Sequence, residues 1–281
     1  ATPAASDIWY VDELMWRPAV PNGSPADLPF DVRLGGETAR VIGVEPLDWD
    51  TFTRTVANGW GTATSGHAWT TANGAASERA VNGTKGVVTL PTTNTIRFQT
   101  LPGDVGDCEI LTLTSASQVA TGASLTSAVL LRYVDVNNHY RARLHFGTGG
   151  QMFASVLRGS TAIGATPTLP FTYTAGQEFW VRVRLIGHRV LLRVWPVSAE
   201  TEPAKWHIDR TIDTDTIAAG RVGTAASSLT GNTNVNPTIG VDDFEVITPQ
   251  RLIVQRTINK VVKAHAVATP LSLATPMPLA L

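Results

Sequence analysis

Polar and apolar residues alternate in two segments of the sequence, with arginine and histidine in residues 140–146 and arginine and tryptophan in residues 178–196. In an extended strand, such alternation places the polar and the apolar side chains on opposite faces. Arginine offers paired donors to carboxylates and phosphates, and tryptophan rings stack on sugar rings. The candidate ligand-binding residues are Arg141, Arg143, His145, Trp180, Arg182, Arg184, Arg193 and Trp195.

The two polar faces would form one binding surface if their strands are neighbours. A surface of arginine and tryptophan would suit an acidic cell-wall polysaccharide. The alternative is an ordinary solvated outer face, in which arginine stems cover tryptophan rings, or a contact between subunits. The sequence leaves these interpretations open.

Three aspartates near the two ends of the middle segment could bind a cation. Asp50 precedes the first predicted strand of this segment, and Asp242 and Asp243 begin its last strand. The first and last strands of a sandwich commonly pair, and carboxylate oxygens suit Ca²⁺. The alternative is that Asp242 and Asp243 are turn residues whose side chains cap backbone amides. The six histidines have neither HxH nor HExxH spacing, which gives zinc little support.

The acidic residues are scattered, unlike the catalytic pair of a glycosidase. Retaining glycosidases place two carboxylates about 5 Å apart, which on one strand requires two acids a few positions apart. Here Glu109 stands alone, Glu200 and Glu202 lie in one turn, and no Glu-x-Asp-x-x-Glu run occurs. A GxSxG nucleophile motif is also lacking. We therefore expect that the protein is not an enzyme, with a polysaccharide-degrading enzyme as the alternative.

The composition is that of an all-β protein. Charged residues make up only 16% of the 281 residues, and threonine, valine and glycine are abundant. The 22 basic and 23 acidic residues nearly cancel, which argues against a nucleic-acid partner. No apolar run is long enough for insertion into a membrane. The single cysteine, Cys108, cannot form an internal disulfide.

The segment 178–196 is predicted to be the central β-hairpin. Its two alternating runs are joined by Gly187-His188 and end at Pro196, which has no N–H to donate to a sheet. Many further short strands, separated by Asn-Gly and Gly-Gly turns, fill residues 49–246. Because each strand has one apolar face that needs cover, we expect a two-sheet sandwich of the jelly-roll type.

The two ends of the chain are predicted to be halves of one small β-module. Residues 28–44 hold two short strands around Gly35-Gly36, and residues 252–273 hold short strands around Asn259-Lys260. We expect Asn259 to take the positive φ of the second turn. The predicted division is residues 1–48 for an N-terminal arm and the first half of a split β-barrel module, 49–246 for an inserted jelly roll, and 247–281 for the second half and a C-terminal tail.

Four stretches of the middle segment resemble the concanavalin A-like, laminin-G-like jelly rolls. They are TFTRTVANGWGTATSGHAWT, VLLRYVDVNNHYRARLHF, the hairpin with its tail WPVSAETEPAKW, and GRVGTAASS with GVDDFEV. The resemblance implies the fold but no single function, because this fold occurs in lectins, hydrolases, lyases and spacers alike. It also implies a structural Ca²⁺ near the junction of the first and last strands.

The flanking stretches LPFDVRLGGETARVIGV and VQRTINKVVKAHAVATPLSL resemble a β-module of tail proteins from long-tailed phages of actinobacteria. In that pattern a glycine usually follows the turn asparagine and another precedes the threonine, where this chain has Lys260 and Ala268. The resemblance implies a minor tail or tail-tip protein of the virion, made in the cytoplasm of the bacterial host. Its partners would be other tail proteins and further copies of itself, as a trimer or hexamer, and the inserted domain would contact a host glycan. The alternative is a secreted bacterial carbohydrate-binding module.

Overall fold

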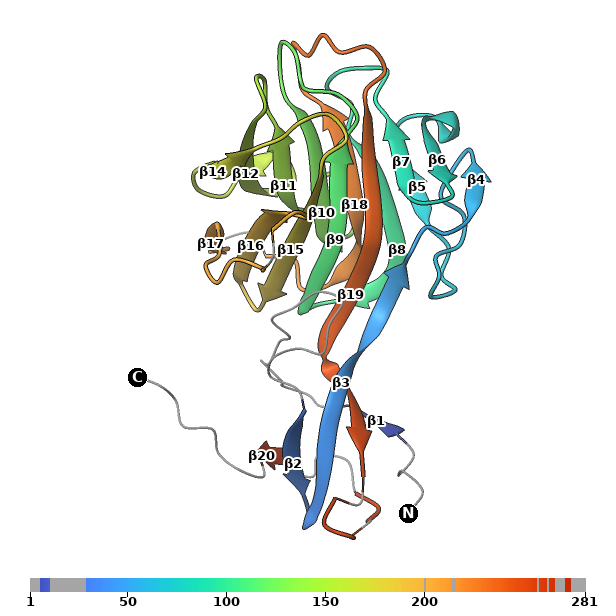
Figure 1. Ribbon diagram of the computed structural model, residues 1–281, viewed down its shortest axis with the longest axis vertical. Helices are drawn as coiled ribbons and strands as arrows, with labels where there is room; N and C mark the ends of the chain where they lie inside the picture. The colour runs from blue at the N-terminus through green and yellow to red at the C-terminus, as the bar shows by residue number, and fades with distance from the viewer. Residues whose placement is uncertain are drawn as a thin grey trace. The chain divides into compact units, whose positions relative to one another are not determined.

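The computed structural model describes residues 6–10, 29–199, 201–213, 216–256, 258–261, 263–265 and 271–273. The chain divides into two compact units, a larger one formed by Asp48–Val246 and a smaller one formed by Ala1–Leu47 together with Ile247–Leu281. Strands dominate both (Figure 1), and the one helical element in the described part is the 3₁₀ turn η1 (Ala76–Glu78). No helix in this part has the length and apolar character needed to cross a membrane. The predicted all-β fold class is confirmed.

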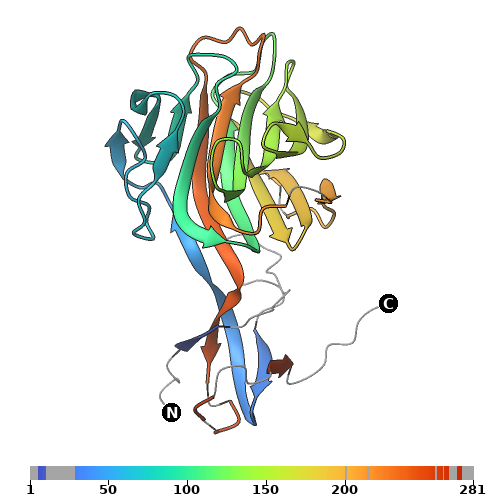
Figure 2. The ribbon, with the colours of Figure 1, turned by 180° about the vertical axis from the view of Figure 1, so that it is seen from behind.

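The larger unit is a sandwich of two antiparallel sheets, seen from opposite sides in Figures 1 and 2. The first sheet is eight-stranded, in the order β13-β12-β11-β10-β18-β8-β5, with β14 also paired to β12. Its strands are β5 (Thr70–Ala72), β8 (Arg97–Val105), β10 (Leu125–Tyr133), β11 (Tyr140–Phe146), β12 (Gln151–Arg158), β13 (Thr161–Ala162), β14 (Thr168–Thr172) and β18 (Gly220–Ser228).

The second sheet contains the central hairpin and runs β17-β16-β15-β9-β19. At Thr238–Val241, β19 also pairs with β7, and β7 is followed by β6 and β4. The strands are β4 (Thr55–Ala57), β6 (Arg79–Asn82), β7 (Gly86–Thr89), β9 (Cys108–Ala116), β15 (Glu178–Ile186), β16 (Arg189–Pro196), β17 (Ile208–Thr211) and β19 (Thr238–Gln255). The predicted jelly-roll sandwich is confirmed.

The predicted central hairpin is confirmed as β15 and β16. The two strands pair in register, with Trp180 opposite Trp195 and Arg182 opposite Arg193. Gly187 begins the connecting turn with a φ of 54°, a conformation that glycine adopts without steric cost. The alternation of polar and apolar residues therefore locates the two strands, and Gly187 locates the turn between them.

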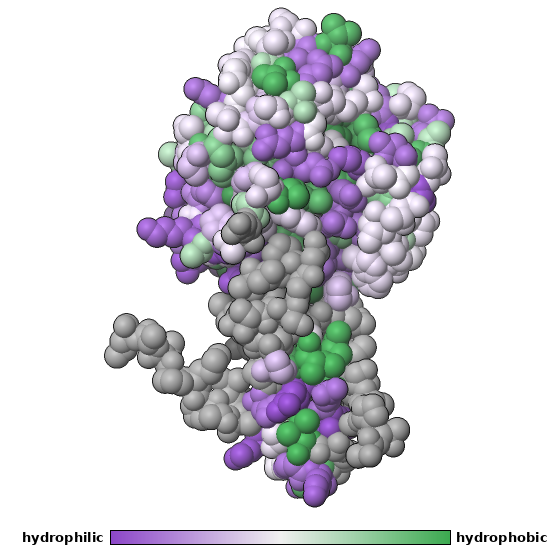
Figure 3. Space-filling view, in the orientation of Figure 1, coloured by the Kyte–Doolittle hydropathy of each residue, from purple (hydrophilic) through white to green (hydrophobic). Residues whose placement is uncertain are grey.

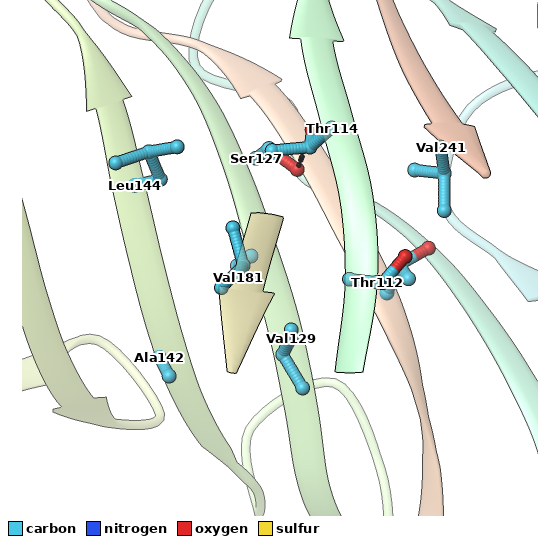
Figure 4. A pocket seen from close by; sticks show the side chains of 10 residues that line it. Thr112, Thr114, Ser127, Val129, Ala142, Leu144, Val181 and Val241 are labelled. Atoms are coloured by element: carbon cyan, nitrogen blue, oxygen red, sulfur yellow. Dashed lines mark hydrogen bonds between the residues drawn. The ribbon is translucent and has the colours of Figure 1, made fainter. Parts of the chain in front are cut away.

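The core lies between the two sheets. Figure 4 shows Ala142 and Leu144 of the first sheet and Val181 of the second sheet around a cavity of about 10 Å³, roughly the space for one water molecule. The Thr114 hydroxyl donates to the Ser127 hydroxyl at 2.8 Å across this interior. A polar group buried in a core is tolerated when it is hydrogen-bonded in this way.

Aromatic packing holds the first long loop of the larger unit. Ring centroids lie 5.1 Å apart for Phe52 and Trp60, 5.0 Å for Trp60 and Trp69, and 5.3 Å for Trp69 and Phe244. A Cβ atom at Gly86 would come within 2.6 Å of the Phe52 ring. Glycine is therefore required at position 86, so that the strand can run directly beneath these rings.

In the smaller unit, residues from the two ends of the chain share one sheet. β2 (Phe30–Leu34) and β3 (Glu37–Asp50) form a hairpin around Gly35-Gly36, and β2 also pairs with β20 (Leu271–Leu273). β1 (Ser6–Tyr10) pairs with β19, which neighbours β3. Apart from β1, the predicted N-terminal arm lies outside the described residues, as does most of the predicted C-terminal tail.

The turn at residues 259–260 differs from the prediction. The φ of Lys260 is 61°, so Lys260 rather than Asn259 occupies the left-handed region. The Asn259 side chain has a different role: its Nδ2 donates to the carbonyl of Gly36 at 2.9 Å, and its Oδ1 accepts from the amide of Thr38 at 3.0 Å. These bonds connect the second turn to the hairpin of β2 and β3. The residue with the positive φ is therefore Lys260 and not Asn259.

Glu37 links the two halves of the smaller unit through a buried carboxylate. Its oxygens accept from Arg256 at 2.8 and 2.7 Å, from the amide of Lys263 at 3.0 Å and from Nε2 of His265 at 2.9 Å. The hydrogen bonds from Arg256 outweigh the opposing effect of burial and lower the pKa of Glu37 to about 2.

This pKa predicts that the smaller unit loses stability in acid. A carboxyl group whose pKa is lower in the folded than in the unfolded state stabilises fully above pH 4.5, and the contribution is lost as the pH falls toward 2. Glu37→Gln should cost roughly 2–3 kcal/mol at pH 7 and almost nothing near pH 2. Urea unfolding of both proteins across this range measures the effect, and an equal deficit at every pH would contradict it.

Candidate functional site

The structure does not bring the two groups of candidate ligand-binding residues together. β11 belongs to the first sheet, and the hairpin of β15 and β16 belongs to the second. Ala142 and Leu144 of β11 face the same interior cavity as Val181 of β15. Because side chains alternate along a strand, Arg143 and Arg182 lie on the outer faces of opposite sheets. The predicted single surface is therefore corrected to two separate polar faces.

On the second sheet, the arginines belong to a closed ion-pair network. Arg182 contacts Glu109 and also lies 2.9 Å from Glu202, while Arg184 lies 2.8 Å from Glu109 and Arg193 lies 2.6 Å from Glu202. Both glutamates and Arg182 are buried. Burial acts to lower the pKa of Arg182, but the two carboxylates outweigh it and raise that pKa above its ordinary value. Each of these three arginines is therefore ion-paired within the protein, although the three positive charges share two carboxylates.

The tryptophans of the second sheet are also engaged internally. The Trp180 and Trp195 rings stack with centroids 6.4 Å apart, are only 8% and 3% exposed, and pack with Leu111 and Leu113. The guanidinium of Arg193 lies 4.1 Å from the centre of the Trp206 ring, in cation–π contact. This face matches the alternative interpretation in which arginine stems and tryptophan rings cover one another.

On the first sheet, the polar residues of β11 meet a serine of the next strand. Nε of Arg143 lies 3.0 Å from Nε2 of His145 and 3.2 Å from Oγ of Ser155, and the latter two atoms are 2.9 Å apart. Nη2 of Arg141 donates to the carbonyl of Gly159 at 2.6 Å. We refer to Arg141, Arg143, His145 and Ser155 as the β11 polar group. The sequence patterns did not indicate Ser155, because the alternation of β12 alone does not reveal which strand it joins.

Strand register places small and aromatic side chains beside this group. The pairs in register are Ser155 with Arg143, Arg143 with Ala128, Ala128 with Ala225, and Ala225 with Phe98. One row across five strands thus runs from a serine and an arginine, over two alanines, to an aromatic ring. Ala128, Ala225 and Phe98 are buried in one hydrophobic cluster, so Arg143 is the member of this row that a ligand can reach.

The protonation state of His145 follows from its surroundings. Burial, followed by the charges of Arg143 and Arg141, lowers the pKa of His145 to about 3. The ring is therefore neutral near pH 7, and Nε2 accepts hydrogen bonds while the proton resides on Nδ1. A base with so low a pKa is poorly matched to activating Ser155 near neutral pH. The group is better suited to binding than to nucleophilic attack.

The predicted calcium ligands do not gather into one site. Both oxygens of Asp50 accept from Arg54, at 2.6 and 2.8 Å, and Oδ2 also accepts from Nε1 of Trp69 at 2.7 Å. Asp242 Oδ1 accepts from the amide of Asp243 at 2.8 Å, as in the capping alternative. In the part of the chain that the structure describes, no three His, Cys, Asp or Glu side chains form a metal-binding group.

Asp242 is predicted to destabilise the protein at neutral pH. Burial raises its pKa to about 6, with smaller contributions from the charges of Asp243 and Glu178. Because the folded state favours the protonated form, stability falls as the pH rises from about 4 to 6. Asp242→Asn should therefore raise the free energy of unfolding at pH 7 by roughly 1–2 kcal/mol and leave it unchanged at pH 3.5. Thermal unfolding checks this, with the exposed Asp209→Asn as a control that should not stabilise.

Exposed apolar side chains are few in the larger unit. Those more than one-third exposed are Trp49, Val134, Val136, Val197 and Val235. On the face seen in Figure 3, hydrophilic and hydrophobic residues are interspersed over this unit. A second cavity, of about 300 Å³, is lined by Arg158 of β12, by β13 and the following Ile163, and by Thr211 of β17 and the following Ile212 and Asp213. The polar clusters are therefore stronger candidates for a ligand site than any apolar surface.

Comparisons with solved structures identify the fold. A xylan beta-1,4-xylosidase from Bacillus halodurans C-125 aligns with a TM-score of 0.50 and 13% identity, over 73% of this chain and 40% of the xylosidase. A beta-1,3-glucanase from Mycobacterium marinum aligns with a TM-score of 0.47 and 14% identity, over 72% of this chain and 98% of that one. The carbohydrate-binding module CBM66 from Bacillus subtilis follows with 0.42 and 15%, over 64% and 95%. No family model and no curated protein matches the sequence.

The fold is a concanavalin A-like jelly roll. At these identities the similarity establishes the fold alone, and it includes both sugar-binding and sugar-cleaving proteins. The expectation that this protein is not an enzyme is wrong, because the similar structures include glycosyl hydrolases. The missing Glu-x-Asp-x-x-Glu run excludes one arrangement of acids on a strand, but not the use of this fold for catalysis.

Proposed function

We propose that the protein is a minor tail or tail-tip protein of a phage virion and that its jelly roll binds a host cell-wall polysaccharide. The split module, residues 1–48 and 247–281, would assemble with other tail proteins, and residues 49–246 would carry the recognition surface. The resemblance of the flanking segments to phage tail modules supports the first part. The protein would assemble as a trimer or hexamer and be made in the cytoplasm of the bacterial host.

The β11 polar group is the observation that carries the glycan assignment. It combines a half-buried arginine with a neutral histidine and a serine. Sugar-binding sites commonly use a small number of convergent polar groups of this kind. The second sheet offers no comparable set, because its arginines and tryptophans already bind one another.

A glycan array tests this proposal with the full-length protein. We expect binding to bacterial cell-wall polysaccharides that is weakened by Arg143→Ala and kept by Arg189→Ala, since Arg189 is an exposed residue of the other sheet. Chromatography of the incubated polysaccharide separates binding from cleavage, and shortened chains would identify a glycosidase. Absence of binding to every polysaccharide would contradict the glycan assignment.

Light scattering tests the assembly. A trimer or hexamer would support the tail assignment, because phage tails impose three-fold or six-fold symmetry. A monomer that still binds polysaccharide would instead support a secreted carbohydrate-binding module. The two measurements therefore distinguish the two parts of the proposal.

A further inference from the structure

Arg141 and Arg143 differ from most of the other buried arginines in the charges around them. Arg79 is also buried without an ion-paired carboxylate, but its guanidinium donates to the backbone carbonyls of Ala72, Asn73 and Ala75. Arg97, Arg132 and Arg182 each contact a carboxylate, at Glu78, Asp107 and Glu109 respectively. Within the described residues, neither Arg141 nor Arg143 has a carboxylate in ion-pair distance, although Arg141 is only 3% exposed. Two positive charges thus lie two positions apart on one strand face, without internal neutralisation.

This arrangement is costly for the protein alone. A buried charge loses its hydration, and only a partner of opposite charge or several hydrogen bonds can restore that energy. Burial, with a contribution from Arg143, lowers the pKa of Arg141 to about 10, so both arginines stay protonated at neutral pH. The neutral state of His145 avoids a third positive charge at this place.

Several donors of the pair also remain unused. Nε of Arg141 is buried and has no hydrogen-bond partner within the described part of the protein. Arg143 uses its Nε toward His145 and Ser155, and its two terminal amino groups make no hydrogen bond to described residues. Arg143 is only half-buried, so an incoming group can reach these terminal donors. Paired guanidinium donors match the geometry of carboxylates and phosphates.

We propose that Arg141 and Arg143 form the binding site for an acidic substituent of the polysaccharide, a carboxylate or phosphate oxyanion. The inference rests on the proposed function and narrows it to an acidic glycan. Arg143 contacts the oxyanion directly, while Arg141 adds positive potential behind it. His145 and Ser155 hold the Arg143 side chain in place through its Nε.

Calorimetric titration of the full-length protein tests this with matched ligands. The probes are oligogalacturonate, the same oligosaccharide fully methyl-esterified, poly(glycerol phosphate) and neutral dextran. We expect binding to at least one acidic probe and at least tenfold weaker binding to the methyl ester, because esterification removes only the charge. Raising NaCl from about 50 to 500 mM should weaken acidic binding. The uronate and phosphate probes distinguish the two sources of the oxyanion.

Two variants that each remove one positive charge distinguish binding at this site from general electrostatic attraction to the protein. Arg143→Gln should weaken acidic binding about tenfold or more, whereas Arg189→Gln should change it less than about twofold. Arg143→Lys keeps the charge without the paired donors and should lose less affinity for the acidic probe than Arg143→Gln. It also provides a second test if the glutamine variant does not fold. Equal losses in the Arg143 and Arg189 variants would overturn the inference.

The remaining outcomes test the acidic binding site and the glycan assignment separately. Binding to neutral dextran or to the methyl ester alone would overturn the acidic site while the glycan assignment stands. The same holds for acidic binding that survives Arg143→Gln unchanged. Absence of binding to all four probes and to the array would overturn both.

Discussion

Replacing Asp50 with alanine is expected to lower the free energy of unfolding of the larger unit by about 3–5 kcal/mol. Asp50 is fully buried and accepts two bonds from Arg54, one from the indole of Trp69, one from the amide of Phe52 and one from the hydroxyl of Thr64. Removing the carboxylate leaves these donors without their acceptor.

The backbone adds to this cost. Phe52 has a φ of 48°, in the left-handed region that large side chains avoid. The bond from its amide to Asp50 and the packing of its ring against Trp60 hold this conformation. Once the bond is lost, the strain of the turn opposes folding.

Denaturant unfolding followed by tryptophan fluorescence measures the effect, because Trp60 and Trp69 lie in the affected loop. The matched control is Asp209→Ala, which removes an exposed ion pair with Arg189 and should cost at most about 1 kcal/mol. An Asp50 variant as stable as this control would show that the carboxylate is not needed for the loop.

Glu109→Ala is expected to have the second-largest effect, again about 3–5 kcal/mol. Glu109 is 1% exposed and forms ion pairs with both Arg182 and Arg184. Without it, Arg184 is partly exposed and can turn to solvent, but Arg182 stays buried with only Glu202 as a counter-charge. A buried charge that loses one partner destabilises far more than the pair itself stabilises.

A double variant separates the buried charge from the lost packing. Glu109→Leu combined with Arg182→Met replaces the pair with apolar side chains and should recover much of the loss, since buried pairs often exchange for apolar contacts at little cost. Glu178→Ala, which removes a half-exposed pair with Lys85, is the control and should change stability by less than about 1 kcal/mol. A double variant no more stable than Glu109→Ala would contradict this account.

The central hairpin could be predicted because its alternation is regular, and its two strands begin and end where the apolar periodicity does. β14 gives no such signal, because it contains Pro170, which interrupts a sheet pattern and is compatible only with limited pairing. At Lys260, the local preference for Asn259 was overridden by side-chain bonds to the other end of the chain.

The sequence by itself determined the all-β class and the faces of β11 and of the central hairpin. Each depends on a local pattern, since a two-residue period fixes which side chains share a face. Only the tertiary structure decided that these polar faces lie on different sheets, that Glu109 meets Arg182 across 73 positions, and that Arg141 and Arg143 have no carboxylate beside them among the described residues. Strand order and register set these contacts, and they depend on pairing between distant segments that no local pattern encodes.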